Sequence, residues 1–220
     1  MTSIAKNIKQ LKESLPQEVQ LVAISKTKPV TDIQKAYDAG QHIFGENKIQ
    51  EMTEKWEKLP KDIEWHMVGH VQSNKVKYMA AYVSLVHAVH KLKLLKEINK
   101  RAKNEERTIK CLLQIKIAKE DSKYGMTTEQ ALEILKSETY QKMKNVQIVG
   151  LMGMATFTEN EEQVNEEFAF LKTTFDKFSE TYPELEILSM GMSGDYQIAV
   201  KNGSNMVRIG SAIFGERNYN

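Results

Sequence analysis

The residue with the clearest chemical potential in this chain is Lys26, which directly follows the apolar run of residues 21–25. A lysine at the mouth of an apolar pocket loses hydration, and its neutral amine can then attack an aldehyde. Lys28 competes for this role, since it lies two residues further on. Pro29 restricts Lys28 to an extended conformation, however, which suits a surface or gating role better. The segment therefore predicts a nucleophilic amine at Lys26.

Two turns near the end of the sequence could bind an anion. The first contains Ser193 and follows the apolar run of residues 185–188, and the second contains Gly210 and Ser211 and follows residues 206–209. Glycine lets backbone amides approach an anion, and the start of a helix favours phosphate. Turns of this kind are common, so each is weak evidence by itself. Together they predict a ligand that carries phosphate.

A permanent cation precedes the second turn. Arg208 lies at the end of the last apolar run, where its guanidinium could face the ring or the phosphate of a ligand. A structural ion pair is the alternative. His66 and His70 have a metal-binding spacing only on a helix, and here a strand and a turn are expected between them. We therefore expect no metal site, and we interpret His42, His87 and His90 as structural or surface residues.

The composition excludes several classes of function. The chain has 220 residues with a net charge of +2, so nucleic acid and anionic membranes are not expected as partners. A single cysteine, Cys111, can form neither an intramolecular disulfide nor a cysteine cluster. We find no signal-peptide pattern and no apolar stretch that could span a membrane. A reduced, cytoplasmic location is the default expectation.

Eight short apolar runs alternate with amphipathic segments that are expected to be helical. The expected strands are residues 21–25, 42–45, 64–68, 83–86, 109–117, 146–152, 185–188 and 206–209. Helices are expected over residues 31–39, up to 56, from 73, over 91–103, 128–136 and 160–181, and after 193. Thr31 or Asp32 is the expected cap of the first of these helices, and Thr127 to Gln130 come close to a capping box at the start of the helix over 128–136. The alternation favours an α/β fold, a single (β/α)8 barrel domain over residues 1–220, although an open doubly wound sheet would show the same pattern.

A barrel would gather the candidate residues at one end. Active sites of this fold lie at the carboxyl ends of the strands. Lys26, Asn47, Ser193 and the pair Gly210 and Ser211 all directly follow expected strands or lie in the turns after them.

At these segments the sequence resembles the pyridoxal phosphate homeostasis proteins, the YggS/PROSC family, over nearly its whole length. The resemblance rests on seven ordered blocks, which are residues 21–29, 44–47, 64–75, 122–125, 150–152, 190–195 and 206–215. It implies a barrel like the N-terminal domain of alanine racemase and pyridoxal 5'-phosphate as the cofactor.

The resemblance also implies roles for individual residues. Lys26 would form a Schiff base with the cofactor, and Asn47 would lie beside it. Ser193, Gly210 and Ser211 would hold the phosphate. Arg208 would face the pyridine nitrogen and keep it unprotonated, which weakens the ring as an electron sink.

One departure from the family pattern and one absence bear on the expected function. His70 stands where many relatives have proline, so its contact with the cofactor is in doubt. The sequence ends at Asn220, without the β-domain that supplies a second catalytic base in alanine racemases. Racemisation needs an acid and a base on opposite faces of the substrate carbon. We therefore expect a monomer with no catalytic residue and no robust turnover.

The leading hypothesis is a protein that stores, buffers or delivers pyridoxal phosphate, with pyridoxal-phosphate-dependent apoenzymes as the recipients. The alternative from the same resemblance is a pyridoxal-phosphate enzyme of the amino-acid racemase type. A third alternative is a sugar-phosphate barrel enzyme that uses the same two turns and no Schiff base.

Overall fold

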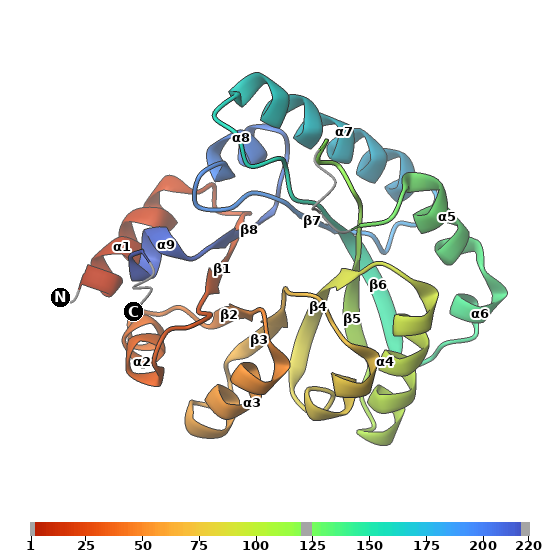
Figure 1. Cartoon of the computed structure of the whole chain (residues 1–220), viewed down its shortest axis with the longest axis horizontal. Coiled ribbons are helices and arrows are strands. Elements are labelled where there is room, and N and C mark those ends of the chain that lie inside the picture. Colours follow the sequence, from red (N-terminus) through yellow and green to blue (C-terminus); the bar gives the residue numbers. More distant parts are fainter. Residues whose placement is uncertain (1–2, 120–124, 217–220) are drawn as a thin grey trace.

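The eight strands form a closed parallel barrel in the computed structural model, which describes residues 3–119 and 125–216 (Figure 1). In chain order the strands are β1 (Gln20–Ile24), β2 (Ile43–Glu46), β3 (Glu64–Met67), β4 (Val83–Val89), β5 (Ile109–Gln114), β6 (Val146–Met152), β7 (Ile187–Ser189) and β8 (Met206–Ile209). The barrel closes where β1 pairs with β8, with Val22 opposite Arg208. The predicted (β/α)8 fold is thus confirmed, and the open sheet is excluded.

Helices surround the barrel (Figure 1). They are α1 (Ser3–Ser14), α2 (Val30–Asp38), α3 (Ile49–Lys58), the 3-10 helix η1 (Ser73–Tyr78), α4 (Leu92–Asn104), α5 (Thr128–Lys136), α6 (Glu138–Gln141), α7 (Glu161–Ser179), α8 (Tyr196–Lys201) and α9 (Ser211–Phe214). The cap of α5 is the one expected from the sequence, because Thr127 and Gln130 form a reciprocal capping box.

The strands are buried on both faces, which explains why they read as continuous apolar runs. Side chains that point into the barrel form an inner cluster, which includes Val22, Leu85, Leu112 and Met152. Side chains that point outward pack against the helices in a larger outer cluster. Because successive side chains of a strand point to opposite faces, each strand contributes to both clusters.

Several elements differ from the sequence-based predictions in kind or in their bounds. The segment from Ser73 forms a 3-10 helix rather than an α-helix. The fifth strand ends at Gln114 rather than at residue 117; the amide of Ile115 still bonds to the carbonyl of Met152 in β6, and Ile115 also bridges Met126. The second helix begins at Val30, with Pro29 before it in the extended conformation, so neither Thr31 nor Asp32 is its cap. Proline is well suited to this position because it gives up no helical amide bond.

The helix α1 was not predicted. Its apolar residues Ile4, Ile8 and Leu11 recur at helical spacing and are buried. The many lysines between them obscured this signal. The side-chain amide of Asn7 donates a hydrogen bond of 3.0 Å to the carbonyl of Ile213, so α1 supports the last helix of the chain.

Candidate functional site

One cavity of about 880 Å3 opens at the carboxyl ends of the strands. Its size lies within the range of small-molecule sites. The structure places five of the six predicted site residues in its wall, namely Lys26, Ser193, Arg208, Gly210 and Ser211. These residues come from both ends of the sequence, and the contact between β1 and β8 brings them together. Asn47 is outside this set, and its contact with a cofactor stays a prediction.

Lys26 is half-buried and lies between two residues whose backbones are fixed. On one side, the amide of Ser25 donates to the carbonyl of Gly45 at 3.0 Å, and its hydroxyl donates to Glu46 at 2.6 Å. On the other side, Thr27 has a positive φ of 63°, and its amide donates to the Glu51 carboxylate. A positive φ is uncommon for threonine, so surrounding contacts must hold it.

The two turns after β7 and β8 are joined to each other. The amide of Gly210 donates a hydrogen bond of 3.2 Å to the hydroxyl oxygen of Ser193. Gly191 has a φ of +96°, and an added Cβ there would lie 2.6 Å from the Cβ of Ala199. The first turn therefore needs glycine at this position, both for its backbone conformation and for its packing against α8.

Arg208 points into the barrel just below the cavity and is only 5% exposed. Its guanidinium donates to the hydroxyl of Ser189 at 2.7 Å and to the carbonyl of Gly153 at 3.0 Å. Burial lowers the pKa of Arg208 to about 10. The guanidinium therefore stays charged at neutral pH. Both contacts are to neutral groups and hold the guanidinium in place, and its role toward a ligand stays a prediction.

A buried chain of polar side chains continues from Arg208 across the barrel. Ser189 lies 3.2 Å from Nδ1 of His87, whose Nε2 lies 3.1 Å from Nδ1 of His66. Burial lowers the pKa of His66 to about 3 and that of His87 well below its ordinary value, so both rings are neutral. Since Arg208 donates to Ser189, the serine proton points to His87. The sequence marked His87 as structural or surface, and its complete burial settles it as structural.

Asn47 and His70, which belong to other resemblance blocks, are not among the described residues that line the cavity. Asn47 follows β2, and its backbone packs so closely on Gly69 that an added Cβ there would lie 2.3 Å from the Asn47 carbonyl oxygen. The ring of His70 lies 5.1 Å from that of His90, not beside His66. Residues 122–124 of the fourth block lie outside the described residues.

Lys28 has a role that its sequence position did not predict. It lines the cavity, but its ammonium donates to the carbonyls of Phe214, Gly215 and Glu216 at 3.0 to 3.2 Å. A lysine bonded to the last carbonyls of a helix caps that helix. Lys28 thus joins the lysine segment to α9, and its expected surface or gating role stays a prediction.

The rim above β5 and β6 is held by a carboxylate that the sequence did not reveal. Glu167 of α7 accepts hydrogen bonds from the amide and hydroxyl of Thr156 at 2.6 and 2.7 Å, and from the amide of Lys119 at 3.2 Å. Burial by itself would raise the pKa of Glu167, but its hydrogen bonds with Gln163, Thr156 and Lys119 together lower it. This charged acceptor fixes Thr156, which lines the cavity.

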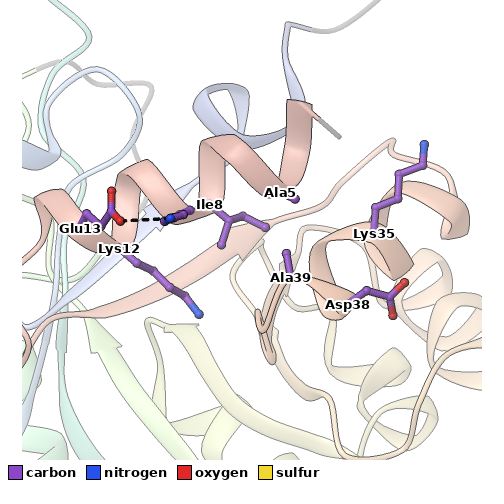
Figure 2. A pocket seen from close by; sticks show the side chains of 8 residues that line it. Ala5, Ile8, Lys12, Glu13, Lys35, Asp38 and Ala39 are labelled. Atoms are coloured by element: carbon purple, nitrogen blue, oxygen red, sulfur yellow. Dashed lines mark ion pairs between the residues drawn. The ribbon is translucent and has the colours of Figure 1, made fainter. Parts of the chain in front are cut away.

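A second hollow of about 650 Å3 lies between α1 and α2 (Figure 2). Its floor includes Ile8 and Ala39, and lysines and acidic residues surround it. The ammonium of Lys12 donates to the carbonyl of Gly40 at 2.7 Å. This hollow contains none of the predicted site residues and lies on the helical layer, away from the carboxyl ends of the strands where barrel chemistry is found.

Within residues 3–119 and 125–216, no group of three His, Cys, Asp or Glu side chains is arranged to hold a metal ion. Over the same ranges, no helix has both the length and the apolar character needed to cross a membrane.

Comparison with known proteins decides the family. The family model for the N-terminal domain of alanine racemase matches residues 1–218. The pyridoxal phosphate homeostasis protein of Vibrio alginolyticus is 37% identical over 100% of both chains. That of Aquifex aeolicus is also 37% identical, over 91% of this chain and 88% of the relative. This chain belongs to the pyridoxal phosphate homeostasis protein family.

Solved structures agree with this family assignment. PipY of Synechococcus elongatus, determined with pyridoxal phosphate bound, superposes with a TM-score of 0.88 at 33% identity, over 96% of this chain and 100% of PipY. Alanine racemase of Clostridium difficile superposes with a TM-score of 0.83 over 99% of this chain and 61% of the racemase. At 15% identity the latter likeness shows the shared fold alone.

Proposed function

We propose that this protein binds pyridoxal 5'-phosphate as a Schiff base on Lys26 and serves intracellular homeostasis of the cofactor. The observation that carries the proposal is the single cavity in which Lys26, Arg208 and the Ser193–Gly210 turns meet. The named role of the homologues and the ligand of PipY support the same cofactor.

The residues present fit the chemical groups of this cofactor. Lys26 supplies the amine that condenses with the aldehyde carbon, with release of water. The hydroxyl oxygen of Ser193 accepts a hydrogen bond from the amide of Gly210. The hydroxyl proton of Ser193 therefore points elsewhere and could be donated to a phosphate oxygen. Gly210 and Ser211 lie beside it in the cavity wall. Asn47, which follows β2, would contact the cofactor only if its side chain turned toward the cavity.

Arg208 supports a role in holding the cofactor rather than in catalysis. Its guanidinium stays protonated at neutral pH and would face the pyridine nitrogen as a donor. A ring nitrogen that accepts a hydrogen bond from arginine stays unprotonated and withdraws electrons weakly. We therefore propose that the bound cofactor turns over amino acids poorly.

An absorption spectrum of purified protein with added pyridoxal phosphate, before and after borohydride reduction, tests the Schiff base. We expect a visible band that reduction removes, and a reduced adduct that mass mapping places on Lys26. Lys26→Ala should abolish both. The matched control is Lys28→Arg, which removes the neighbouring nucleophilic amine, can still donate to the carbonyls at the end of α9 and should keep the adduct. Colourless wild-type protein, or an adduct on Lys28, would overturn the proposal.

The racemase alternative makes a different prediction. Exchange of the α-proton of L- and D-alanine for deuterium, followed by proton NMR, should be slow with the loaded protein. Fast exchange of both enantiomers would show an enzyme of the racemase type.

The proposal extends to the setting of the protein. It would act as a cytoplasmic monomer that passes the cofactor to pyridoxal-phosphate-dependent apoenzymes. Light scattering of the purified protein tests the monomer, and cell fractionation tests the location. Activation of an apoenzyme by loaded protein, compared with an equal amount of free cofactor, tests delivery.

A further inference from the structure

A group of buried and partly buried polar side chains, three of them charged, lies on the outer side of the barrel behind Lys26. It consists of Ser25, Glu46, Glu51 and Lys55, and we refer to these four residues as the lysine clamp. Ser25 follows β1, Glu46 ends β2, and the other two lie on α3. The clamp is separate from the cavity wall, because none of its members lines the cavity.

Lys55 is the centre of the clamp. Its ammonium donates to the carbonyl of Ser25 at 2.8 Å, to Oε1 of Glu46 at 2.7 Å and to Oε1 of Glu51 at 2.7 Å. An ammonium has three donors, so these three bonds use all of them. Lys55 is 5% exposed and Glu46 is fully buried. A fully bonded ammonium of this kind does not compete with Lys26 as a nucleophile.

The clamp acts on both neighbours of Lys26. The carboxylate of Glu46 accepts a hydrogen bond from the hydroxyl of Ser25, and the ammonium of Lys55 donates one to the carbonyl of Ser25. The carboxylate of Glu51 accepts a hydrogen bond from the amide of Thr27. In β1, Val22 and Ile24 point into the barrel, and Leu21 and Ala23 point outward. Ser25 continues this alternation toward the outside. Lys26 follows Ser25 in a turn, which the bond from the Lys28 amide to the Ser25 carbonyl closes, and it lines the cavity.

The clamp is a costly way to stabilise a fold. Oε2 of Glu46 is buried without a hydrogen-bond partner among the described residues, and burial raises the pKa of Glu46. A well-packed apolar group at such a position often gives equal or greater stability than buried charges. The arrangement is therefore better explained by the geometry that it imposes than by the free energy that it contributes.

We propose that Glu46, Lys55 and Glu51 are positioning residues, which hold the segment of residues 25–27 so that the amine of Lys26 points into the cavity. The inference rests on the proposed function, in which that amine binds pyridoxal phosphate. It adds that the reactivity of Lys26 depends on charges outside the cavity.

The test measures the rate at which Lys26 forms the borohydride-trapped adduct, well below the melting temperature of each variant. Glu46→Gln keeps the shape of the side chain and removes its charge, and Ser25→Ala removes only the hydroxyl bond. We expect the rate to fall about ten- to a hundredfold in Glu46→Gln, since small misplacements of a reacting group have effects of this size. We expect a smaller fall in Ser25→Ala, which deletes one hydrogen bond without leaving a charge.

A stability control separates positioning from general loosening. Ile98 lies in α4, is fully buried and does not belong to the clamp, so Ile98→Ala lowers the melting temperature without altering residues 25–27. We expect this variant to trap the cofactor on Lys26 at the wild-type rate. We also expect Glu46→Gln to shift part of the adduct from Lys26 to Lys28. Equal loss of rate in Glu46→Gln and Ile98→Ala, with no change of site, would overturn the proposal.

A second measurement does not need the cofactor. Apo-protein is treated with an amine-reactive ester, and labelling of each lysine is followed by mass spectrometry. Wild-type Lys26 should react more slowly than the exposed Lys142, and in Glu46→Gln its rate should approach that of Lys142. If wild-type protein forms no Schiff base, the proposed function fails, and this measurement still decides the clamp. Unchanged labelling of Lys26 in Glu46→Gln and Ser25→Ala would refute it.

Discussion

The two sides of the cavity are built in opposite ways. On the lysine side, formed by β1, β2 and α3, charged side chains hold the backbone from outside the barrel. On the other side, formed by β6, β7, β8 and α7, the charged side chains of Arg208 and Glu167 bond to neutral hydroxyl, amide and carbonyl groups, and the amide of Gly210 joins the two turns by bonding to Ser193. In the proposed function, the first side directs a reactive amine and the second binds a phosphate.

The proposed function accounts for this difference. A lysine has a long flexible side chain, so its direction is set by fixing the backbone on both sides of it. A phosphate accepts hydrogen bonds from any direction, so short turns with closely placed donors are sufficient. Two buried carboxylates show the same contrast. Burial raises the pKa of Glu46, whereas the hydrogen bonds of Glu167 outweigh its burial and lower its pKa.

The largest expected effect is on the lysine side. Lys55→Met leaves the buried Glu46 and the partly buried Glu51 without their shared cation. We expect a loss of about 3 to 5 kcal/mol in the free energy of unfolding, measured by urea denaturation. The matched control is Lys142→Met, whose pair with Glu138 is exposed and should contribute nothing measurable. Equal stability of Lys55→Met and wild type would mean that Glu46 and Glu51 do not need the cation of Lys55 in the folded protein.

On the side of the turns, glycine geometry should matter more than charge. Gly191→Ala forces a positive φ on alanine and brings its Cβ against Ala199. We expect a loss of about 1 to 3 kcal/mol in the free energy of unfolding, again by urea denaturation. Gly194→Ala is the matched control, since its Cβ would meet no atom within 4 Å. If both variants are equally stable, the turn does not depend on the conformation of Gly191.

The two carboxylates should give opposite dependence on pH. Glu167 has a pKa below its ordinary value of 4.5, so its stabilising effect is present above that pH and is lost as the pH falls through its folded-state pKa. The difference in melting temperature between wild type and Glu167→Gln should therefore become smaller at acidic pH. Glu46 has a raised pKa, so its ionisation in the folded protein costs stability as the pH rises above 4.5. The melting temperature of wild type should therefore fall relative to that of Glu46→Gln as the pH rises.

Melting temperatures of the three proteins across the acid range to neutrality provide the measurement. Parallel curves for the two variants would contradict the contrast between the carboxylates.

The smallest expected effect concerns a single hydroxyl. Ser193→Ala removes one donor to the phosphate but leaves the backbone amides of both turns. We expect a loss of about 0.5 to 1.5 kcal/mol in binding, which weakens the apparent Kd for pyridoxal phosphate about two- to tenfold. Absorbance titration measures it, with Ser179→Ala in α7 as a remote control. A loss of a hundredfold or more would mean that this serine, rather than the amides, dominates anion binding.

Patterns with a short period were sufficient to predict most of the fold. Apolar runs marked the strands, and the capping box at Thr127 marked the start of a helix, because both signals depend on neighbouring residues. The expectation that chemistry lies at the carboxyl ends of barrel strands then grouped Lys26 with Ser193 and Gly210, and the structure places all three in one cavity. Predicted elements failed at their boundaries, as at Gln114, where contacts with distant segments end the strand.

By itself, then, the sequence determined the alternation of strands and helices and the residue types available at the strand ends. Only the tertiary structure decided which of these residues act together. Lys28 bonds to carbonyls more than 180 residues away, and Ser189 meets His87 across 102 residues. Lys55 in α3 reaches the carbonyl of Ser25, 30 residues earlier in the chain. Such contacts leave no local pattern, because they exist only after barrel closure has brought β1 against β8 and each helix against its strands.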